Sequence, residues 1–499
     1  MPPAKVHIIQ IKLAPGRIAE LYALVSENPQ LMTLCPELDQ AQVVVTGIHM
    51  RQRLERHLDW ETAGTKAIVT PEWLRESAKQ GILLPYADYA AIRGLIPRQL
   101  DPRDASPSIL TPPSSPEPQE TLEQPHYSSR YACLRPCPLE SPNQELARQL
   151  AVIRQDRELD GNATSALVYE RATSVIIAYP HKITAARMNE LAKLPFMGEK
   201  MLAKVEEYIE SGTITESQKI AASGRFRALS AFTTIYGIGP STARKLFDVF
   251  GLRTFDELVA HFSTNELPYL NDDRSESRIQ TRAPTLKIQA ALALREELNE
   301  RIPRTEVEAM HSVVMAELEQ IKGGCTGTIV GGYRRGKAYS NDVDIVITHP
   351  SLANEPSLVS DLCEKLVNQL FQRGLITHLM HLGSFLQPGA PRHPSLSTIE
   401  KALTVFRLPP QLDPRGVHRR LDLIVVAPET YWTAIVGWTG SKMFERDLRL
   451  WAKERGLNFD SSGITRRSNG KQYFPQTEEE VFSTMGLGYL DPTLRNADA

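Results

Sequence analysis

The stretch GGYRRGKAYSNDVDIVITHP, residues 331–350, joins a turn rich in glycine and arginine to two aspartates inside an apolar segment. The Val and Ile residues predict a buried β-strand. Alternate residues of a strand project from the same face, so Asp342 and Asp344 are expected to point together, away from Val343 and Ile345. Neighbouring carboxylates repel each other, and oxygen ligands suit Mg²⁺ or Mn²⁺. The pattern therefore predicts a carboxylate pair that binds divalent metal.

A third carboxylate lies in HRRLDLIVVAP, residues 418–428, where Asp422 again interrupts an apolar, strand-like run. A neighbouring strand would place it beside the first pair. Three carboxylates can hold two metal ions about 3.5–4 Å apart, which orient an attacking hydroxyl and stabilise in-line phosphoryl transfer. Asp342, Asp344 and Asp422 are therefore predicted to be metal ligands and catalytic residues, with two Mg²⁺ ions, or Mn²⁺ in their place.

The turn before the first strand has the composition of a triphosphate site. Gly331 and Gly332 allow backbone amides to approach phosphate oxygens. Arg335 can bind such oxygens through two parallel hydrogen bonds, and Ser340 adds a hydroxyl donor. The turn therefore predicts a nucleoside triphosphate as substrate.

Two segments, residues 194–214 and 235–259, predict helical hairpins that bind DNA. In the second, Gly237 and Gly239 permit a tight turn before a helix, and the amide N–H groups at such a helix end attract phosphate. These contacts position DNA without reading its sequence. The two segments resemble helix-hairpin-helix motifs. In the first, Phe196 occupies the position at which these motifs usually have a glycine.

The first hairpin also carries Lys200 and Lys204, which share one helix face. Neighbouring ammonium groups disfavour each other's charge, which favours a neutral, nucleophilic amine. Such an amine can attack the aldehyde of an abasic sugar and form a Schiff base. The ordinary alternative is a pair of solvated surface lysines.

The N-terminal region is separated from the rest by residues 101–125, which contain seven prolines and few large apolar residues. Such a composition predicts a disordered linker. Before it, apolar strand-like segments alternate with segments of helical spacing, and Trp73 follows Pro71 at a predicted helix start. Residues 5–90 resemble a BRCT domain, and this resemblance places Trp73 in the core.

Composition excludes several classes of protein. The chain has 499 residues, too many for one core, and a formal net charge of −2, which excludes a histone-like basic protein. Five scattered cysteines predict a reducing compartment without a disulfide framework. The apolar runs are too short to cross a membrane, so no membrane partner is expected.

The region from about residue 145 to 496 resembles the family X DNA polymerases. The matching segments are YERATSVIIAYPHKI, the two hairpins, RIPR, the two aspartate strands and GWTGSKMFERDLRLWAKERGL. The resemblance implies a multidomain α/β and α+β fold. Its expected parts are an α/β BRCT domain (1–98), a Pro/Ser-rich linker (99–140), a helical lyase-type domain with the first helix-hairpin-helix (141–225), a helical DNA-binding subdomain with the second (226–300), a nucleotidyltransferase palm with a mixed sheet (301–435), and a small C-terminal subdomain that binds nucleotide and template (436–499).

The resemblance also implies residue roles, with Asp422 near the primer 3′-hydroxyl as its activator. The implied contacts to the incoming nucleotide are Arg301, Gly332, Arg335, Ser340, Gly437 and Trp438. The implied contacts to DNA are Tyr169, Lys200, Gly237, Gly239, Arg420, Arg446 and Arg449. Lys204 matches the Schiff-base lysine of a 5′-deoxyribose-phosphate lyase, whereas Ser165 replaces a basic residue of that site. A monovalent cation is implied at the hairpins.

Within the family, GWTGS and GGYRRGK resemble the mu and terminal-transferase branch, whereas Lys204 is a lambda- and beta-like feature. The implied function is a nuclear, monomeric polymerase that fills short gaps and bridges broken ends in non-homologous end joining. Gly437 implies tolerance of rNTPs beside dNTPs, and the lyase implies base-excision repair. Residues 384–403 resemble a loop that supports or replaces the template in that branch.

The BRCT domain implies end-joining partners, namely the Ku heterodimer and the ligase IV complex. Three alternatives remain at this point. The first is a template-independent terminal transferase, and the second is another nucleotidyltransferase on the same palm, acting on RNA ends. The third is a non-enzymatic DNA-repair scaffold of BRCT domain and hairpins, although a scaffold has no need of three adjacent carboxylates.

Overall fold

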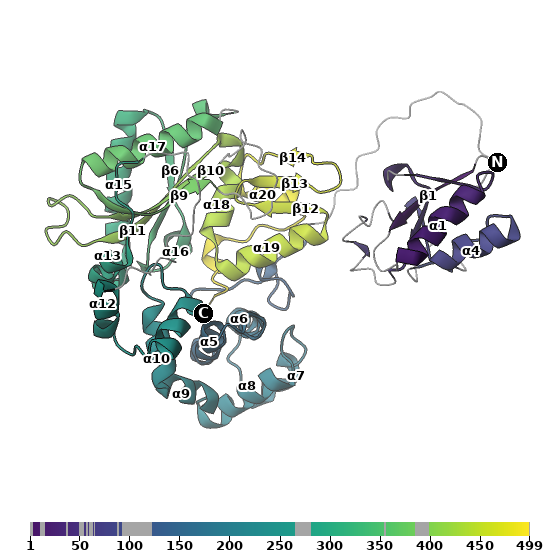
Figure 1. Cartoon of the computed structure of the whole chain (residues 1–499). Helices are drawn as coiled ribbons and strands as arrows, with labels where there is room; N and C mark the ends of the chain where they lie inside the picture. The colour runs from purple at the N-terminus through teal and green to yellow at the C-terminus, as the bar shows by residue number, and fades with distance from the viewer. Residues whose placement is uncertain are drawn as a thin grey trace. The chain divides into compact units, whose positions relative to one another are not determined.

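In a computed structural model the chain forms two units, residues 1–117 and 118–499, which are described separately (Figure 1). The described residues are 3–9, 15–35, 38–48, 54–55, 58, 63, 65–86, 89–91, 122–264, 281–353, 356–384 and 399–498.

The N-terminal unit contains a four-stranded parallel sheet in the order β2-β1-β3-β4. Its strands are β1 (Ala4–Ile9), β2 (Met32–Leu34), β3 (Val43–Thr46) and β4 (Ala67–Val69), and its helices include α1 (Pro15–Glu27) and α4 (Pro71–Gln80). Trp73 is fully buried, and its indole N–H donates to the Leu84 carbonyl at 2.9 Å. Helix α4 begins at Pro71 and ends before Gly81 (φ 68°), as its sequence predicts.

The second unit is built around a mixed sheet in the order β6-β8-β11-β10-β9, as expected for the palm. The strands are β6 (Thr326–Ile329), β8 (Val343–Thr348), β9 (Ile376–Ser384), β10 (Ile399–Phe406) and β11 (Arg419–Val426). Strands β8 and β11 are parallel, and the other neighbours are antiparallel. Helices α15 (Arg304–Ile321) and α17 (Pro356–Gln372) cover one face of this sheet (Figure 1).

The period of two along β8 assigns its residues to the two faces. Val343, Ile345 and Ile347 are buried against α15 and α17. Val346 points the other way and packs against α18 (Tyr431–Thr439). Asp344 shares this second face, which therefore carries the polar site.

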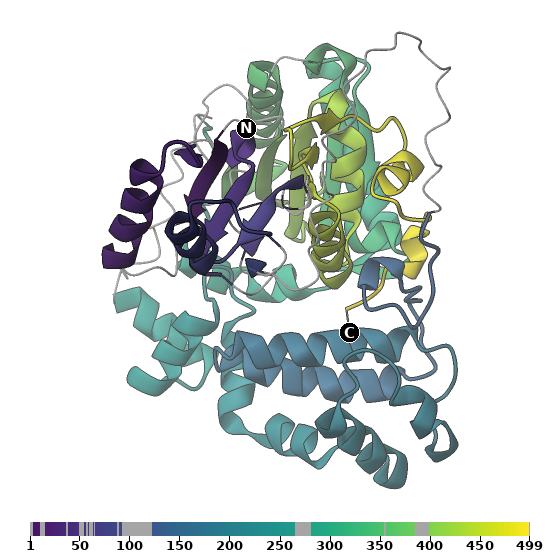
Figure 2. The ribbon, with the colours of Figure 1, turned by 90° about the vertical axis from the view of Figure 1, so that its right-hand side faces the viewer.

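Helices occupy residues 144–264, before the sheet in sequence, and Figure 2 shows the blue helices α5 and α6 side by side in this region. The helices are α5 (Gln144–Leu159), α6 (Ala163–Ala178), α7 (Met188–Leu191), α8 (Glu199–Ser211), α9 (Thr215–Ala222), α10 (Gly224–Phe232), α11 (Pro240–Arg244), continued by the π-helical turn η5 (Lys245–Val249), and α12 (Phe255–Thr264). Helices α13 (Ile288–Ala293) and α14 (Arg295–Asn299) lead into the sheet region.

Both predicted hairpin turns form. Gly237 has φ 90° before α11, where an L side chain would be strained. Phe196 has φ 65°, the left-handed conformation that glycine normally provides. The first hairpin therefore keeps the backbone of the motif although it lacks the glycine, and the Arg171 guanidinium lies 5.3 Å from the Phe196 ring centre.

The C-terminal subdomain contains α18, α19, α20 and a three-stranded sheet. The further bounds are α19 (Lys442–Glu454), β12 (Leu457–Asp460), β13 (Gly463–Arg466), β14 (Gln472–Tyr473) and α20 (Glu478–Thr484). Buried residues of α18, α19 and α20 form one hydrophobic cluster with residues 132–214 of the helical region. The two regions therefore share a core.

The predicted linker, residues 99–140, extends too far toward the C-terminus. Residues 122–140 are folded and include the short helix η3 (Ala132–Leu134). The amide of Ala132 donates to Asp447 Oδ2 at 2.7 Å, and both residues are buried. Burial against a helix 315 residues later leaves no periodic signal in the local sequence. The proline-rich part, up to residue 121, lies outside the described residues.

The predicted loop at 384–403 also ends earlier in the structure than the sequence suggests. Residues 399–403 belong to β10, where Ile399 and Ala402 are buried in the sheet. Residues 385–398 lie outside the described part of the chain. In that described part, no helix combines the length and apolarity needed to cross a membrane.

Candidate active site

The three predicted aspartates meet on one face of the sheet. Asp344 and Asp422 are register partners on the parallel strands β8 and β11. Asp342 stands two residues before Asp344, so it is aligned with the same face. Asp342 Oδ2 forms an ion pair with Arg420 Nη2 at 3.0 Å. The expectation that a neighbouring strand supplies the third carboxylate is therefore confirmed.

Burial and the charge of neighbouring carboxylates disfavour the ionised forms of Asp344 and Asp422. Burial raises the pKa of Asp344 well above its usual range, and Asp342 and Asp422 raise it further. Burial also raises the pKa of Asp422 to about 7, although Arg420 and Lys401 favour its charged form. Added positive charge is what such a cluster needs to ionise fully.

The side chains fit divalent metal ions by their chemistry. Asp422 Oδ1 is buried and has no hydrogen-bond partner in the described structure, so one ligand atom is left unsatisfied. All the candidate ligands are oxygens, which suits Mg²⁺. No three acidic, His or Cys side chains of the described ranges converge in a metal-ligating arrangement. Arg420 instead serves as counter-ion to Asp342.

The glycine-rich turn packs directly on the aspartates. Gly331 begins the short helix α16 (Gly331–Arg334) with φ 60°, and a Cβ atom there would lie 2.1 Å from Asp344 Oδ2. Only glycine allows this approach. From α15, Arg304 Nη1 donates to the carbonyls of Tyr333 at 2.8 Å and Lys337 at 3.2 Å, which holds the turn in place.

Three cations gather at this turn. The pKa of Lys337 is lowered by burial, then by Arg335 and Arg301, whereas Asp498 and Asp342 oppose the shift. Arg335 and Arg301 are therefore close enough to Lys337 for their charges to act on it, as is Asp342. Sequence analysis assigned the first two but missed Lys337, although it follows the turn directly. Ser340 is buried beside the turn, 3.9 Å from a Cβ built on Gly332.

In each Arg-Arg pair of the site, the first arginine belongs to a structural ion-pair network. Arg334 forms two hydrogen bonds with Glu478, at 2.9 and 2.7 Å, and Glu478 also accepts from the fully buried Arg495 at 2.8 Å. Arg419 is likewise buried and ion-paired, whereas the next residue, Arg420, pairs with Asp342. Arg335, which follows Arg334, is close enough to Asp342 and Asp344 for their charges to favour its charged form. Sequence analysis missed these roles of Arg334 and Arg419.

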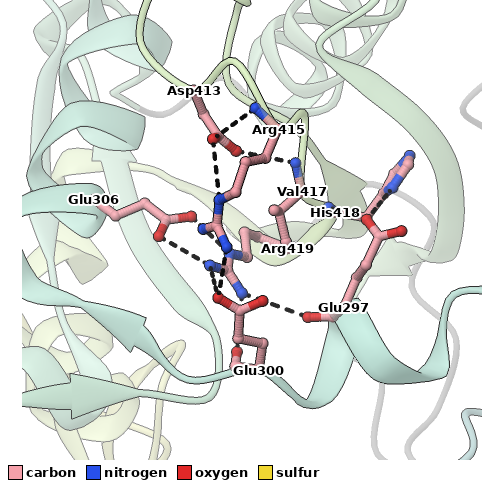
Figure 3. A network of polar contacts seen from close by, with 8 residues as sticks. All are labelled: Glu297, Glu300, Glu306, Asp413, Arg415, Val417, His418 and Arg419. Atoms are coloured by element: carbon pink, nitrogen blue, oxygen red, sulfur yellow. Dashed lines mark hydrogen bonds and ion pairs between the residues drawn. The ribbon is translucent and has the colours of Figure 1, made fainter.

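Arg419 anchors strand β11 in the network that Figure 3 shows. It is 2% exposed and donates to both carboxylate oxygens of Glu306, at 2.6 and 3.0 Å, and to the Glu300 carbonyl at 3.0 Å. Burial would lower the pKa of Arg419, but Glu306 and Glu300 raise it above its ordinary value. Next to it, His418 Nδ1 lies 2.8 Å from Glu297 Oε2. Strand β11 is thereby tied to α14 and α15.

Gly437 and Trp438 lie at the end of α18, over the polar face of the sheet. A Cβ on Gly437 would lie 2.5 Å from Ser461 Oγ. The glycine therefore also permits α18 to pack against the turn between β12 and β13. Sequence analysis considered only the space that it leaves for a sugar.

The first hairpin places Lys204 differently from the expected reactive amine. Lys204 Nζ forms an ion pair with Glu216 of α9, and Glu216 pairs in turn with Arg157. Tyr169 is close, because Lys204 is among the groups that influence its pKa, which burial raises. Lys200 is exposed one turn earlier on α8. The Glu216 partner was missed, since it lies on another helix.

The predicted template-side residues lie on α19. Arg446 Nη1 pairs with Glu170 of α6 at 2.9 Å, and Arg449 pairs with Glu445 on its own helix. Both arginines are partly exposed. Gly239 precedes Pro240 at the start of α11, in the second hairpin.

The geometry defines a class of protein: a nucleotidyltransferase palm combined with DNA-binding hairpins. Four domain families match the chain, and they follow one another in the order of the helical region, the palm and the C-terminal subdomain. They are a helix-hairpin-helix domain over residues 141–214, the fingers domain of DNA polymerase lambda over 230–268, the DNA polymerase beta palm over 301–428 and the DNA polymerase beta thumb over 434–496.

Individual proteins agree with this assignment. The chain is 32% identical to human DNA-directed DNA/RNA polymerase mu over 386 residues, 75% of this chain and 73% of that protein. It is 29% identical to Xenopus laevis DNA nucleotidylexotransferase over 386 residues, 74% and 71% of the two chains. The chain belongs to the family X DNA polymerases. Its enzymatic class, a DNA nucleotidyltransferase, displaces the scaffold alternative.

Proposed function

We propose that this polymerase fills short gaps and bridges broken DNA ends in double-strand break repair by non-homologous end joining. The main observation in support is that three aspartates share one face of the sheet, next to an arginine-rich turn. Two hairpins precede them in the sequence. Similarity to polymerase mu supports the repair role. Primer extension on a one-nucleotide gap and on two ends with short complementary overhangs tests it. Failure on both substrates would contradict the proposal.

In this proposal Asp342, Asp344 and Asp422 hold two Mg²⁺ ions, which when bound supply positive charge for the developing phosphoryl transition state. Asp422 orients the primer 3′-hydroxyl, and Arg420 holds the primer end. Arg301, Arg335, Lys337 and the amide of Gly332 bind the triphosphate, with Ser340 beside them. Trp438 packs against the sugar. The hairpin amides around Gly237 and Gly239 hold the DNA backbone. A monovalent cation is also predicted to bind at the hairpins.

We expect ribonucleotides to be used nearly as well as deoxyribonucleotides. Glycine at 437 removes the bulk that would press on a 2′-hydroxyl, so kcat/KM for a matched rNTP should lie within about tenfold of the dNTP value, ~1.4 kcal/mol. Both constants are measured on a one-nucleotide gap. A preference for dNTPs above about a thousandfold would place the discriminating residue elsewhere.

The structure also dictates how Gly437 is tested. Because its Cβ would meet Ser461 Oγ at 2.5 Å, Gly437→Tyr is combined with Ser461→Gly, and Ser461→Gly alone is the matched control. The double variant should regain discrimination against rNTPs, and the control should not.

A 5′-deoxyribose-phosphate lyase is proposed at Lys204. Lys204→Ala should abolish borohydride trapping to a 5′-deoxyribose-phosphate end, because no Schiff base can form. Glu216→Gln should raise the trapping rate by up to about tenfold, since it removes a charge that holds the amine in an ion pair. Lys219→Ala, an exposed lysine of α9, is the control. Absence of trapping in the wild type would show that the departures at Ser165 and Phe196 disable the site.

The N-terminal unit is proposed to be a BRCT domain that binds end-joining factors, the Ku heterodimer and the ligase IV complex, in the nucleus. Deleting residues 1–117, the whole unit, should leave gap filling unchanged, because the site lies in the second unit. Co-assembly with those factors on broken ends should be lost. Both are measured with purified components, and retained co-assembly would move the docking surface to residues 118–499.

Template-independent terminal transfer is a second candidate, favoured by the similarity to DNA nucleotidylexotransferase. Extension of a single-stranded primer, compared with the one-nucleotide gap, distinguishes the two functions. Equal rates would favour the transferase, and a large excess on the gap would favour the templated polymerase. The protein is expected to act as a monomer in both cases.

A further inference from the structure

The C-terminal segment Leu494–Asp498 packs beside Arg335, a proposed ligand of the nucleotide. The Cys137 amide donates to the Leu494 carbonyl at 2.6 Å, and the Asn496 amide donates back to Cys137 at 3.0 Å. On the other side, the Ala497 amide donates to Ser441 Oγ at 3.1 Å. The segment therefore connects residue 137 with the turn between α18 and α19.

Within this segment, Asn496 holds Arg335 from two directions. It is 6% exposed, and its Oδ1 accepts from Arg335 Nε at 3.3 Å. Its Nδ2 donates to the Arg335 carbonyl at 3.3 Å and to the Thr493 carbonyl at 2.8 Å. One amide side chain thus fixes both the backbone and the guanidinium of the arginine.

The remaining contacts leave one edge of the guanidinium for a ligand. Arg335 Nη1 donates to the Thr439 carbonyl, and a Cβ on Gly440 would lie 2.9 Å from this same nitrogen. Within the described structure, Nη2 has no hydrogen-bond partner. Asn496 and Thr439 therefore set the direction in which Nη2 points.

Asp498 fastens the end of the segment beside the same cations. Its carboxylate accepts from the amides of Lys442 and Met443, each at 2.9 Å, at the start of α19. It also favours the charged form of Arg335, whose pKa burial lowers. A pocket of about 150 Å³ lies here, lined by Arg335, Lys337, Ser441, Asn496 and Asp498 among others.

We propose that Asn496 is a positioning residue for nucleotide binding, which acts by orienting Arg335 toward the triphosphate. The inference rests on the proposed role of Arg335 as a triphosphate ligand. A guanidinium binds phosphate strongly only when its flat donor edge is aligned with the oxygens, so a small rotation of Arg335 weakens binding. The C-terminal segment is thereby part of the nucleotide site.

The competing explanation is structural, because neighbours of Asn496 are core residues. Arg495 and Ala497 are almost fully buried, so any substitution nearby can loosen the subdomain. Asp491→Ala provides a matched control. Asp491 Oδ1 accepts from the Thr493 amide at 2.8 Å and so stabilises the turn that leads into this segment, without a hydrogen bond to Arg335.

The test is a double-mutant cycle with single-turnover kinetics on a one-nucleotide gap. Asn496→Ala, Arg335→Ala and the double variant are compared for the dissociation constant of the dNTP and for the maximal incorporation rate. Asn496→Ala should weaken dNTP binding about tenfold, as expected for a misaligned hydrogen bond to a charged group. The incorporation rate should fall less. In the Arg335→Ala background, Asn496→Ala should have no further effect.

The outcomes separate the inference from the function on which it rests. If Arg335→Ala leaves dNTP binding unchanged, the proposed role of Arg335 is wrong. If Arg335→Ala weakens binding but the effects of the two substitutions are additive, Asn496 does not act through Arg335. If Asp491→Ala weakens dNTP binding as much as Asn496→Ala at an equal loss of melting temperature, the role of Asn496 is structural.

Discussion

Asp422→Asn is expected to reduce nucleotide transfer by about three orders of magnitude or more, the effect of removing a group that acts on the reacting atoms. Asp422 is 5% exposed and lies beside Asp344, with one carboxylate oxygen unsatisfied. Asparagine keeps the shape of the side chain but loses the charge that, in the proposed mechanism, binds metal and activates the primer hydroxyl. Asp342→Asn and Asp344→Asn should have comparable effects.

DNA binding should survive these substitutions, because the proposed DNA contacts are the hairpin amides and basic residues and not the aspartates. Transfer is measured by single-turnover extension with a Mg²⁺ titration, and binding by fluorescence anisotropy on the same gapped duplex. Asp361→Asn, which removes an exposed carboxylate paired with Lys365 on α17, is the control and should leave both unchanged. Near-normal extension by any variant of the three aspartates would refute the metal assignment.

Glu306→Leu is expected to destabilise the protein by about 3–5 kcal/mol, the cost of leaving a buried arginine without its partner. Arg419 is 2% exposed, and Glu306 supplies its two shortest carboxylate contacts, at 2.6 and 3.0 Å, while Glu300 Oε1 lies farther away, at 3.4 Å. The melting temperature of the second unit should fall by about 10 °C. Because Arg420 and Asp422 follow on the same strand, transfer should also decline.

The expected loss of stability comes from breaking the ion pair between Arg419 and Glu306, which leaves one buried charge without its partner. Arg419→Met combined with Glu306→Leu removes both buried charges and should recover most of the lost stability. Melting of the truncated protein, residues 118–499, is followed by circular dichroism for each variant. If the double variant is as unstable as Glu306→Leu alone, the loss comes from packing and not from an unpaired charge.

The aspartate site could be predicted because a strand has a short and strict period. The spacing of Asp342 and Asp344 fixes their common face, and the apolar run around Asp422 marks a second strand of the same kind. Which arginine of each Arg-Arg pair forms a structural ion pair did not follow from the local sequence. Their structural partners, Glu478 and Glu306, lie in other elements and leave no local trace.

Other features depend on contacts between distant parts of the chain, which a single sequence does not encode locally. A side chain at position 437 would clash with Ser461, and the ion-pair partner of Lys204 lies on α9. The same holds for residues 122–140, whose proline-rich surroundings predict disorder. There the structure shows Cys133, Leu134 and Cys137 fully buried.

The core shared by residues 132–214 and the C-terminal subdomain affects how the chain acquires its structure during synthesis. Ala132 and Asp447, which are hydrogen-bonded and buried together, are 315 residues apart. At about 5–20 residues per second, the ribosome needs about 15–60 s to deliver the second after the first. During that interval the apolar side chains around Cys133 lack the surface that the C-terminal subdomain provides. Chaperones that cover exposed apolar segments would find this one available until translation is nearly finished.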